Sequence, residues 1–466
     1  ARVRVVSLLG RLADARAAEA LRAALSDPEP RVQRRAASAL GRLPESPETE
    51  SALLEAFGAA ELSERRAIAE ALGKVGGERA HALLGGISPA DPELARRVKN
   101  ALLLLERRAS RGQECRIVTD RALERRGRLL VRCRAGLAEL LAEELQPLGS
   151  PRVAGAALVE LDFGGPLAEL FRARIALEWG FRVDLARNTE LAAAVAAALE
   201  GSAARGVLSR WTAGRPRFRL EFASGGPARA RVFRVAHELS QKLPELVNDP
   251  RGASWTFVVV DDVPDPHLVL VPRGFSDPRF AYRRRDVPAA SHPTVAAALA
   301  RAAGPRPGDR VWDPFVGSGL ELVERARLGP AAALTGSDID PEALGAAREN
   351  LDAAGVRATL VLGDAARHEP GPTSLILTNP PMGRRLVRDR SLGTLLDRFV
   401  EHASRVLEPG GRLVWLSPLP RNTRERANSS GLEFQTGQPV DLGGFEVELQ
   451  IFRRPFPKSR NQSGRS

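Results

Sequence analysis

Cysteine, methionine and long apolar runs are all scarce in this sequence of 466 residues. The two cysteines, Cys115 and Cys133, lack a metal-binding spacing and are too few for a disulfide framework, so we expect a reducing, cytoplasmic location and no metal site. No stretch approaches the length of a membrane span, and none has the pattern of a signal peptide. The single methionine is Met382, and we expect the sequence to begin inside a longer chain.

Acidic residues are the minority charge, 57 against 69 lysines and arginines, which gives a formal net charge of +12. A basic surplus predicts a polyanionic partner. Nearly all of the basic residues are arginine, which a coding bias would also produce, so their distribution is more informative than their sum. The first 110 residues are close to balanced in sign, whereas the surplus gathers in residues 205–234, in residues 279–285 and after Arg453. The length suggests three domains.

Residues 1–108 carry an internal repeat. Leu-Gly-Arg-Leu at residues 9–12 recurs at residues 40–43 and, as Leu-Gly-Lys-Val, at residues 72–75, a period of roughly 31 residues. Each unit predicts two short amphipathic helices. The pattern resembles HEAT-type repeats, which implies an all-α solenoid whose groove binds a protein partner. A structural arm or a dimer contact is the alternative interpretation.

The segment Val-Trp-Asp-Pro-Phe-Val-Gly-Ser-Gly, residues 311–319, predicts a short strand, a glycine-rich turn and a helix that begins at Leu320. Gly317 and Gly319 would let the backbone approach a ligand, and the helix N-terminus would present free amides to it. Three further strands follow along the chain, and we expect the carboxyl ends of all four to meet in one crevice. The polar residues at these ends are Asp313, Asp338, Asp364 and Asn379.

The order of these motifs resembles the class I S-adenosylmethionine-dependent methyltransferases that modify exocyclic amines. The motifs are DPFVGSG, GSDID, GDA, NPPMG and LEPGGRLVW, and the resemblance implies an α/β Rossmann-like fold with a seven-stranded, mostly parallel sheet over residues 287–456. It also implies S-adenosylmethionine as the cofactor. By this resemblance Asp338 holds the ribose and Asp364 pairs with the adenine amino group. The other cofactor-binding candidates are Thr294, Asp313, Phe315, Gly317, Gly319 and Asn379.

The turn Asn379, Pro380, Pro381 and Met382 is the catalytic candidate. An exocyclic amine on a nucleobase is weakly nucleophilic because its lone pair is delocalised into the ring. The Asn379 carbonyl and the main-chain carbonyl of Pro380 could accept both of its N–H bonds, while the prolines stiffen the turn. Catalysis would then be mostly positioning.

Met382 stands where the family has an aromatic residue that stacks on the flipped base. A thioether is a poorer platform, so we expect Phe315 or Tyr282 to stack instead, and a degenerate site is the alternative. Thr294 opens a helix and could equally be only a cap. Three arginines after Gly383 could hold substrate phosphates or only cover a surface loop; they are Arg384, Arg385 and Arg388.

The middle of the chain, residues 128–286, resembles the ferredoxin-like and THUMP-like RNA-binding region that precedes the catalytic domain in THUMP-containing guanine methyltransferases. We expect a linker over 110–127, a helix over 167–179 and another over 235–247. Within residues 205–234 arginines alternate with aromatic residues, which predicts strands that contact RNA, although those aromatics could equally form core. A generic α+β domain is the alternative.

These observations predict an RNA methyltransferase that transfers a methyl group to guanine N2 in tRNA or rRNA. Methylation of adenine N6 in RNA or DNA is the alternative activity, because the same turn holds either amine. A non-catalytic RNA-binding scaffold is the alternative from another class. Residues 457–466 are basic and polar, and we expect them to be disordered.

Overall fold

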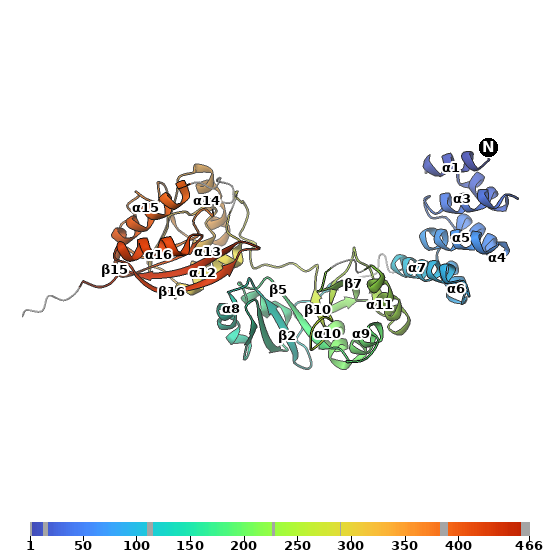
Figure 1. Cartoon of the computed structure of the whole chain (residues 1–466), viewed down its shortest axis with the longest axis horizontal. Helices are drawn as coiled ribbons and strands as arrows, with labels where there is room; N and C mark the ends of the chain where they lie inside the picture. The colour runs from blue at the N-terminus through green and yellow to red at the C-terminus, as the bar shows by residue number, and fades with distance from the viewer. Residues whose placement is uncertain are drawn as a thin grey trace, which may run out of the picture. The chain divides into compact units, whose positions relative to one another are not determined.

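The computed structural model describes two compact units of the chain (Figure 1). Unit 1 comprises residues 1–118 and 182–275, and unit 2 comprises residues 119–181 and 276–466. The predicted domain boundaries stay predictions. The described residues are 2–12, 17–109, 115–225, 229–288, 290–382 and 390–457. The predictions for Gly383, Arg384, Arg385, Arg388 and most of the basic tail lie outside these ranges.

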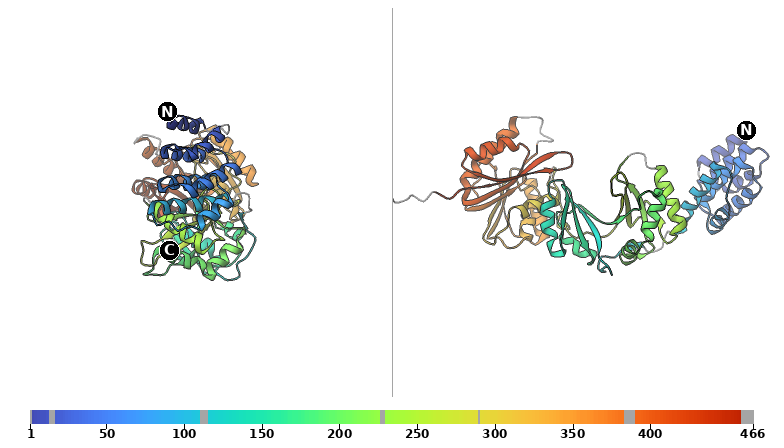
Figure 2. Two further views of the ribbon diagram at one scale, coloured as in Figure 1. Left: turned by 90° about the vertical axis from the view of Figure 1, so that its right-hand side faces the viewer. Right: turned by 60° about the horizontal axis from the view of Figure 1, so that its bottom comes forward.

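Unit 1 begins with a stack of helices, seen from two further sides in Figure 2. Leucine, alanine and valine from successive helices form one continuous core, to which Leu21, Leu40 and Leu72 contribute. The predicted all-α repeat region is therefore confirmed. Its elements are α1 (Arg2–Leu12), α2 (Ala18–Ala23), a 3-10 turn (Ala24–Ser26), α3 (Pro30–Leu40), α4 (Pro47–Ala59), α5 (Leu62–Val75), α6 (Glu78–Gly85) and α7 (Pro92–Ala109).

The repeated glycine of the sequence motif marks where α1, α3, α5 and α7 pack against one another. A Cβ atom on Gly10 would lie 2.6 Å from the Cβ of Ala39, and one on Gly73 would lie 2.6 Å from the Cα of Ala101. Gly41 faces Ala71 in the same way, at 3.2 Å. The motif recurs because each helix needs a residue without a side chain at the point of closest approach.

The second segment of unit 1 is an α+β region. Its strands β7, β8, β9 and β10 form a sheet in the order β10-β9-β7-β8, in which only β9 and β10 are antiparallel. Residues Trp211, Phe218 and Phe257 are buried in its core. The elements are α9 (Leu191–Glu200), α10 (Ser202–Arg210), β6 (Thr212–Gly214), β7 (Arg217–Phe222), α11 (Arg229–Lys242), β8 (Val247–Asn248), β9 (Trp255–Val260) and β10 (His267–Pro272).

Three predictions for this region were wrong. Residues 229–234 lie on α11 and not on a strand, because Val232, Ala236 and Leu239 recur at helical spacing. The helix ends at Lys242, since Pro244 disfavours helical geometry just before it. The predicted linker contains β1 (Cys115–Ile117), which pairs with β6 about a hundred residues later. Such distant pairing leaves no local signal.

Unit 2 begins with an antiparallel sheet in the order β3-β4-β2-β5. The helix predicted over 167–179 is wrong after Arg172, because Ile175 donates its amide to buried Glu144 at 2.9 Å and the chain then enters β5. Tertiary contacts therefore override local helix propensity. The elements are β2 (Gly127–Arg132), α8 (Ala138–Leu145), a 3-10 turn (Gln146–Leu148), β3 (Arg152–Gly155), β4 (Leu158–Phe163), a 3-10 helix (Leu167–Arg172) and β5 (Glu178–Asp184).

The rest of unit 2 contains a seven-stranded mixed sheet in the order β13-β12-β11-β14-β15-β17-β16, which confirms the prediction. Neighbouring strands are parallel except at β17, which is antiparallel to both of its neighbours. The strands are β11 (Arg310–Asp313), β12 (Ala333–Asp338), β13 (Thr359–Leu362), β14 (Thr373–Thr378), β15 (Leu407–Ser417), β16 (Glu433–Asp441) and β17 (Glu446–Arg453).

Helices cover this sheet. Phe399 of α15 packs with Trp312 and Trp415 of the strands, and α16 adds Ala427 to the same core. In a second group of helices, α13 packs against both α12 and α14, and α12 also contacts α8. The helices are α12 (Pro293–Ala302), α13 (Leu320–Arg327), α14 (Pro341–Ala354), α15 (Arg390–Val406) and α16 (Pro420–Ser429), labelled in Figure 1.

The basic segment 279–285 is built into unit 2. Arg279 is only 7% exposed and donates to the carbonyls of Ala173 and Ala176 at 2.6 and 2.7 Å. Arg174 and Tyr282 both donate to Glu324, at 2.5 and 2.6 Å. The side chains of Arg174 and Arg279 therefore connect the two segments of unit 2, residues 119–181 and 276–466.

No single helix among the described residues is long and apolar enough to cross a membrane, and only the bent pair α9–α10 meets that test, by length and composition alone. Both cysteines are free thiols.

Candidate functional site

A cleft of about 420 Å³ lies at the carboxyl ends of the central strands of unit 2, where the chain order reverses. Ligands of open α/β sheets bind at this position. The cleft brings together seven of the predicted site residues. They are Phe315, Gly317, Asp338, Asp364, Asn379, Pro380 and Pro381.

The glycine turn shapes one wall of the cleft. Gly317 has a φ of +49° and Gly319 a φ of +80°, conformations that favour glycine. The amide of Gly317 donates to Oδ2 of Asp338 at 2.9 Å, which ties the turn to the end of β12. Gly319 does not line the cleft; it precedes α13, and a Cβ atom there would lie 3.3 Å from Ala347.

Asp313 lies beneath the cleft and is fully buried. Its Oδ1 accepts hydrogen bonds from the Thr378 hydroxyl at 2.6 Å and from the Phe315 amide at 3.2 Å. Its Oδ2 is buried without a hydrogen-bond partner among the described residues. Burial, helped by the charge of Glu321, raises the pKa of the Asp313 carboxyl well above its usual value.

Two other acids face the cleft directly. Asp338 also accepts from the Asp340 amide at 3.0 Å, and Asp364 accepts from the Ala366 amide at 2.8 Å, so both carboxylates are oriented by backbone donors. Ile339, between two acids, is 77% exposed and lines the cleft as an apolar wall. The arrangement can accept hydrogen bonds from hydroxyl and amino groups beside a flat apolar surface.

A chain of hydrogen bonds orients Asn379. Its Nδ2 donates to Oγ of Ser291 at 2.7 Å, and the Ser291 hydroxyl donates to the carboxylate of Glu321. Oδ1 of Asn379 is buried and has no hydrogen-bond partner among the described residues. Burial raises the pKa of Glu321 to about 7.

Sequence reasoning did not assign a role to Ser291 or Glu321, although both line the cleft. Glu321 stands in the first turn of α13, two residues after the glycine turn, and that position is the signal that could have found it. Ser291 offers no such signal, because its partners are 30 and 88 residues away.

Other predicted residues do not line the cleft. Thr294 is 1% exposed, and its Oγ1 lies 2.8 Å from Nδ1 of His292, which caps α12. Met382 lies outside the cleft lining. Tyr282, one of the two proposed stacking residues, is 2% exposed and bound to Glu324, so Phe315 is the candidate that reaches the cleft.

The cleft fits the predicted cofactor. A glycine turn offers close backbone approach, oriented carboxylates stand at the ends of β12 and β13, and the exposed Ile339 can lie against an adenine ring. The unpartnered Oδ2 of Asp313 is an acceptor beside the turn. No group of three metal-binding side chains lies together in the described part of the chain.

Two family models match this sequence. Residues 281–447 match the family described as RMKL-like, methyltransferase domain, and residues 1–73 match HEAT repeats. The resemblances of both ends of the chain are therefore confirmed. The methyltransferase match covers the cleft and every predicted site residue.

Two curated relatives are similar over the same region. The chain is 37% identical to tRNA (guanine(6)-N2)-methyltransferase of Thermus thermophilus over 166 residues, 35% of this chain and 49% of that protein. It is 31% identical to U6 snRNA (guanine-N(2))-methyltransferase THUMPD2 of Bos taurus over 160 residues, 33% of this chain and 31% of that protein. The matches span less than two thirds of either relative.

A solved structure extends the similarity toward the N-terminus. The crystal structure of TrmN from Thermus thermophilus superposes with a TM-score of 0.58 at 26% identity, and the alignment covers 70% of this chain and 99% of that one. The fold similarity thus reaches beyond residues 281–447, the region that the methyltransferase family model matches.

Proposed function

We propose that this protein is an S-adenosylmethionine-dependent RNA methyltransferase that modifies the exocyclic amine of guanine, N2. The observation that carries the proposal is the orientation of Asn379, whose Nδ2 is committed to Ser291 while Oδ1 stays free. A free carbonyl oxygen is the acceptor that an amine substrate requires. The names of the relatives from Thermus thermophilus and Bos taurus support guanine N2 as the target.

The residues of the cleft would act by positioning. Oδ1 of Asn379 and the main-chain carbonyl of Pro380 accept the two N–H bonds of the amine, which directs its lone pair toward the donor. Ser291 and Glu321 hold the amide in that orientation. Phe315 lines the cleft and gives the base an aromatic surface. Its ring packs edge-on against that of Phe399, with the ring centroids 5.2 Å apart. Fixed geometry of this kind lowers the entropic cost of in-line transfer.

S-adenosylmethionine, when bound, supplies the electrophilic methyl group. Asp338 would accept from its ribose hydroxyls, Asp364 from its adenine amine, and the turn at Gly317 would approach its methionine end, near Asp313. Gly319 would contribute through the shape of the turn, and Thr294 by supporting the first turn of α12. Pro381 and Met382 would fix the direction in which the backbone leaves the catalytic turn.

The remaining parts would serve RNA. We assign residues 1–108 to a repeat arm that binds a protein partner. We assign residues 128–286 to a ferredoxin-like and THUMP-like region that presents the RNA, and residues 287–456 to the catalytic domain. The buried Trp211, Phe218 and Phe222 favour the core interpretation of the arginine-aromatic segment, so the exposed arginines would contact RNA phosphates. We place the protein in the cytoplasm.

An Asn379→Ala variant tests the activity. Both proteins are incubated with undermethylated tRNA or rRNA and methyl-labelled S-adenosylmethionine, and the modified nucleosides are identified by mass spectrometry. We expect transfer to guanine N2 to fall by at least about a hundredfold. Asn428→Ala, at an exposed position on α16, is the control. Undiminished transfer would remove the turn from the mechanism.

The same assay addresses the alternatives. If the product contained N6-methyladenine, the target base would be adenine and not guanine. A scaffold would neither bind S-adenosylmethionine at millimolar concentration nor label any RNA.

A further inference from the structure

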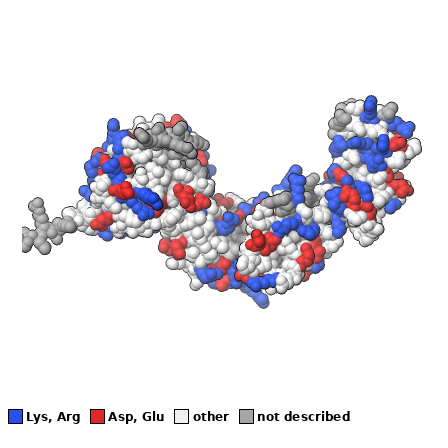
Figure 3. All heavy atoms as spheres, in the orientation of Figure 1, with Lys and Arg blue, Asp and Glu red and all other residues white. Residues whose placement is uncertain are grey.

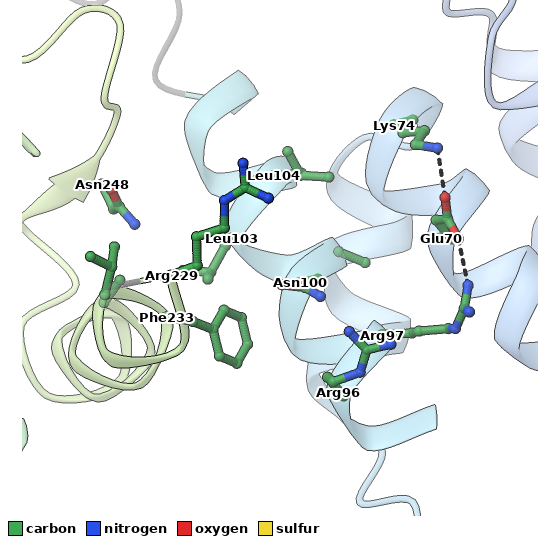
Figure 4. Close-up of a pocket in the computed structure, with 13 residues that line it drawn as sticks. Glu70, Lys74, Arg96, Arg97, Asn100, Leu103, Leu104, Arg229, Phe233 and Asn248 are labelled. Carbon is green, nitrogen blue, oxygen red and sulfur yellow. Dashed lines mark hydrogen bonds and ion pairs between the residues drawn. The ribbon is translucent and has the colours of Figure 1, made fainter. Parts of the chain in front are cut away.

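Unit 1 contains a second cleft, of about 720 Å³, between the repeat helix α7 and helix α11 of the α+β region (Figure 4). Its floor is apolar, with Leu103 and Leu104 on one side and Val232 on the other. Its volume falls in the range of ordinary ligand pockets. No step of the proposed methyl transfer uses it.

The rim of this cleft is positively charged. Four cations line it, Lys74, Arg96, Arg97 and Arg229, and Glu70 is the one carboxylate among the lining residues. Glu93, outside the lining, also pairs with Arg96 and Arg97 at 2.7 and 2.9 Å. Glu70 holds Lys74 and Arg97 at 2.7 and 2.5 Å, which directs both cations along one edge (Figure 4). Arg229 is exposed and has no ion-pair partner among the described residues. Space-filling atoms show lysine and arginine side chains on the repeat helices, with acidic side chains among them (Figure 3).

One aromatic side chain projects into the same space. Phe233 of α11 points toward α7 and is half-buried, so it is not part of the core (Figure 4). Its ring stacks on His237 with centroids 6.2 Å apart and planes only 4° apart. Burial and nearby Lys99 lower the pKa of His237, so this ring is neutral at pH 7. The amide of Asn100 lies opposite Phe233 and can read a base edge.

We propose that this cleft binds an unpaired nucleotide of the RNA substrate, with its base against Phe233 and its phosphate at Arg229. A nucleotide unites a flat ring with a charged phosphate, and the cleft unites a half-buried aromatic ring with a cationic rim. An acidic peptide would need the cations but not the ring. The inference rests on the proposed function for the identity of the RNA. It gives the repeats a direct part in holding that RNA.

Two variants of the full chain test the proposal, Phe233→Ala and Arg229→Glu. Binding of undermethylated tRNA is measured by fluorescence anisotropy at several salt concentrations. We expect each variant to weaken binding by about tenfold, the usual cost of one stacked base or one phosphate contact. Arg229→Glu should also make the plot of log affinity against log salt concentration less steep, by about the contribution of one released counterion. Arg42→Glu, an exposed arginine in the turn after α3 and outside the cleft, is the control and should change affinity less than twofold.

Thermal melting of each variant separates lost binding from lost folding, and Arg229→Glu is a surface change that leaves the core intact. RNA binding that is equal in wild type, both variants and the control would overturn the proposal while leaving the catalytic assignment in place. Binding that depends on Phe233 and Arg229 in a protein that transfers no methyl group would support the cleft and defeat the enzyme. Affinity lost equally in the Arg42 control would also overturn the cleft, because net charge alone would explain it.

Discussion

Nδ2 of Asn379 donates a hydrogen bond of 2.7 Å to Oγ of Ser291, a residue 88 positions earlier in the chain. The only hydroxyl proton of Ser291 goes to Glu321, so its oxygen is left as an acceptor for the amide. The orientation of the Asn379 side chain is thereby fixed with its carbonyl free for an amine.

We expect Ser291→Ala to lower kcat by about tenfold, because the amide then loses the acceptor that fixes its orientation. The KM for S-adenosylmethionine should change little. Ser291→Thr keeps the hydroxyl and should restore most of the rate. Steady-state kinetics with saturating RNA measure both, and an unchanged kcat in the alanine variant would show that Ser291 has no positioning role.

Glu321 makes stability depend on pH. Its pKa is raised to about 7 by burial, so the folded state binds this proton between about pH 4.5 and 7 when the unfolded chain does not. The resulting stabilisation is complete below the unfolded pKa and is lost as pH rises through 7, on the order of 3 kcal/mol at most. Buried Asp313, whose pKa is also raised, contributes with the same sign.

The melting temperature of Glu321→Gln should therefore decrease less between pH 5 and pH 8 than that of the wild type. The decrease that remains would include the contribution of Asp313. Circular dichroism melts across this range measure the effect. A variant with the full wild-type slope would show that Glu321 does not titrate there.

Asp338→Asn should weaken S-adenosylmethionine binding by about 10- to 100-fold, the cost of losing a charged acceptor. The asparagine amide would also present a donor to the N–H of Gly317 or Asp340, both of which now bond to the carboxylate. Isothermal titration calorimetry measures the affinity. Asp352→Asn, on the exposed side of α14, is the matched control and should bind normally. Equal affinities would contradict a cofactor role for Asp338.

Gly73→Ala should destabilise the repeats by about 1–3 kcal/mol, because its Cβ would overlap Ala101 of the next repeat. Gly58→Ala should instead stabilise by up to about 0.5–1 kcal/mol, since Gly58 lies in α4 with open space around it. Urea unfolding of both variants checks the contrast. Equal effects of the two changes would mean that helix propensity alone decides them.

Local patterns identified much of the domain that contains the seven-stranded sheet. The strands that end at Asp313, Asp338 and Thr378 and the helix that begins at Leu320 lie within a few residues of their expected positions. Apolar runs closed by an acid or a glycine produce such elements from neighbouring residues alone. The repeat motif was visible for a similar reason, because one packing contact recurs at a constant spacing.

Contacts between distant residues were not visible in the same way. The alternation of arginine and aromatic residues favours a strand at Phe233, which in fact lies on α11. Tyr282, a stacking candidate, is bound to buried Glu324 and does not line the cleft. β1 pairs with a strand about a hundred residues later, and no neighbouring residue signals it.

The sequence by itself determined the helical repeats, the order of the strands that border the cleft and the polar residues at their ends, since these depend on spacing along the chain. Only the tertiary structure decided that Ser291 and Glu321 orient Asn379. A buried polar group takes whichever partner the packing brings within hydrogen-bond distance, and that partner has no fixed separation in sequence.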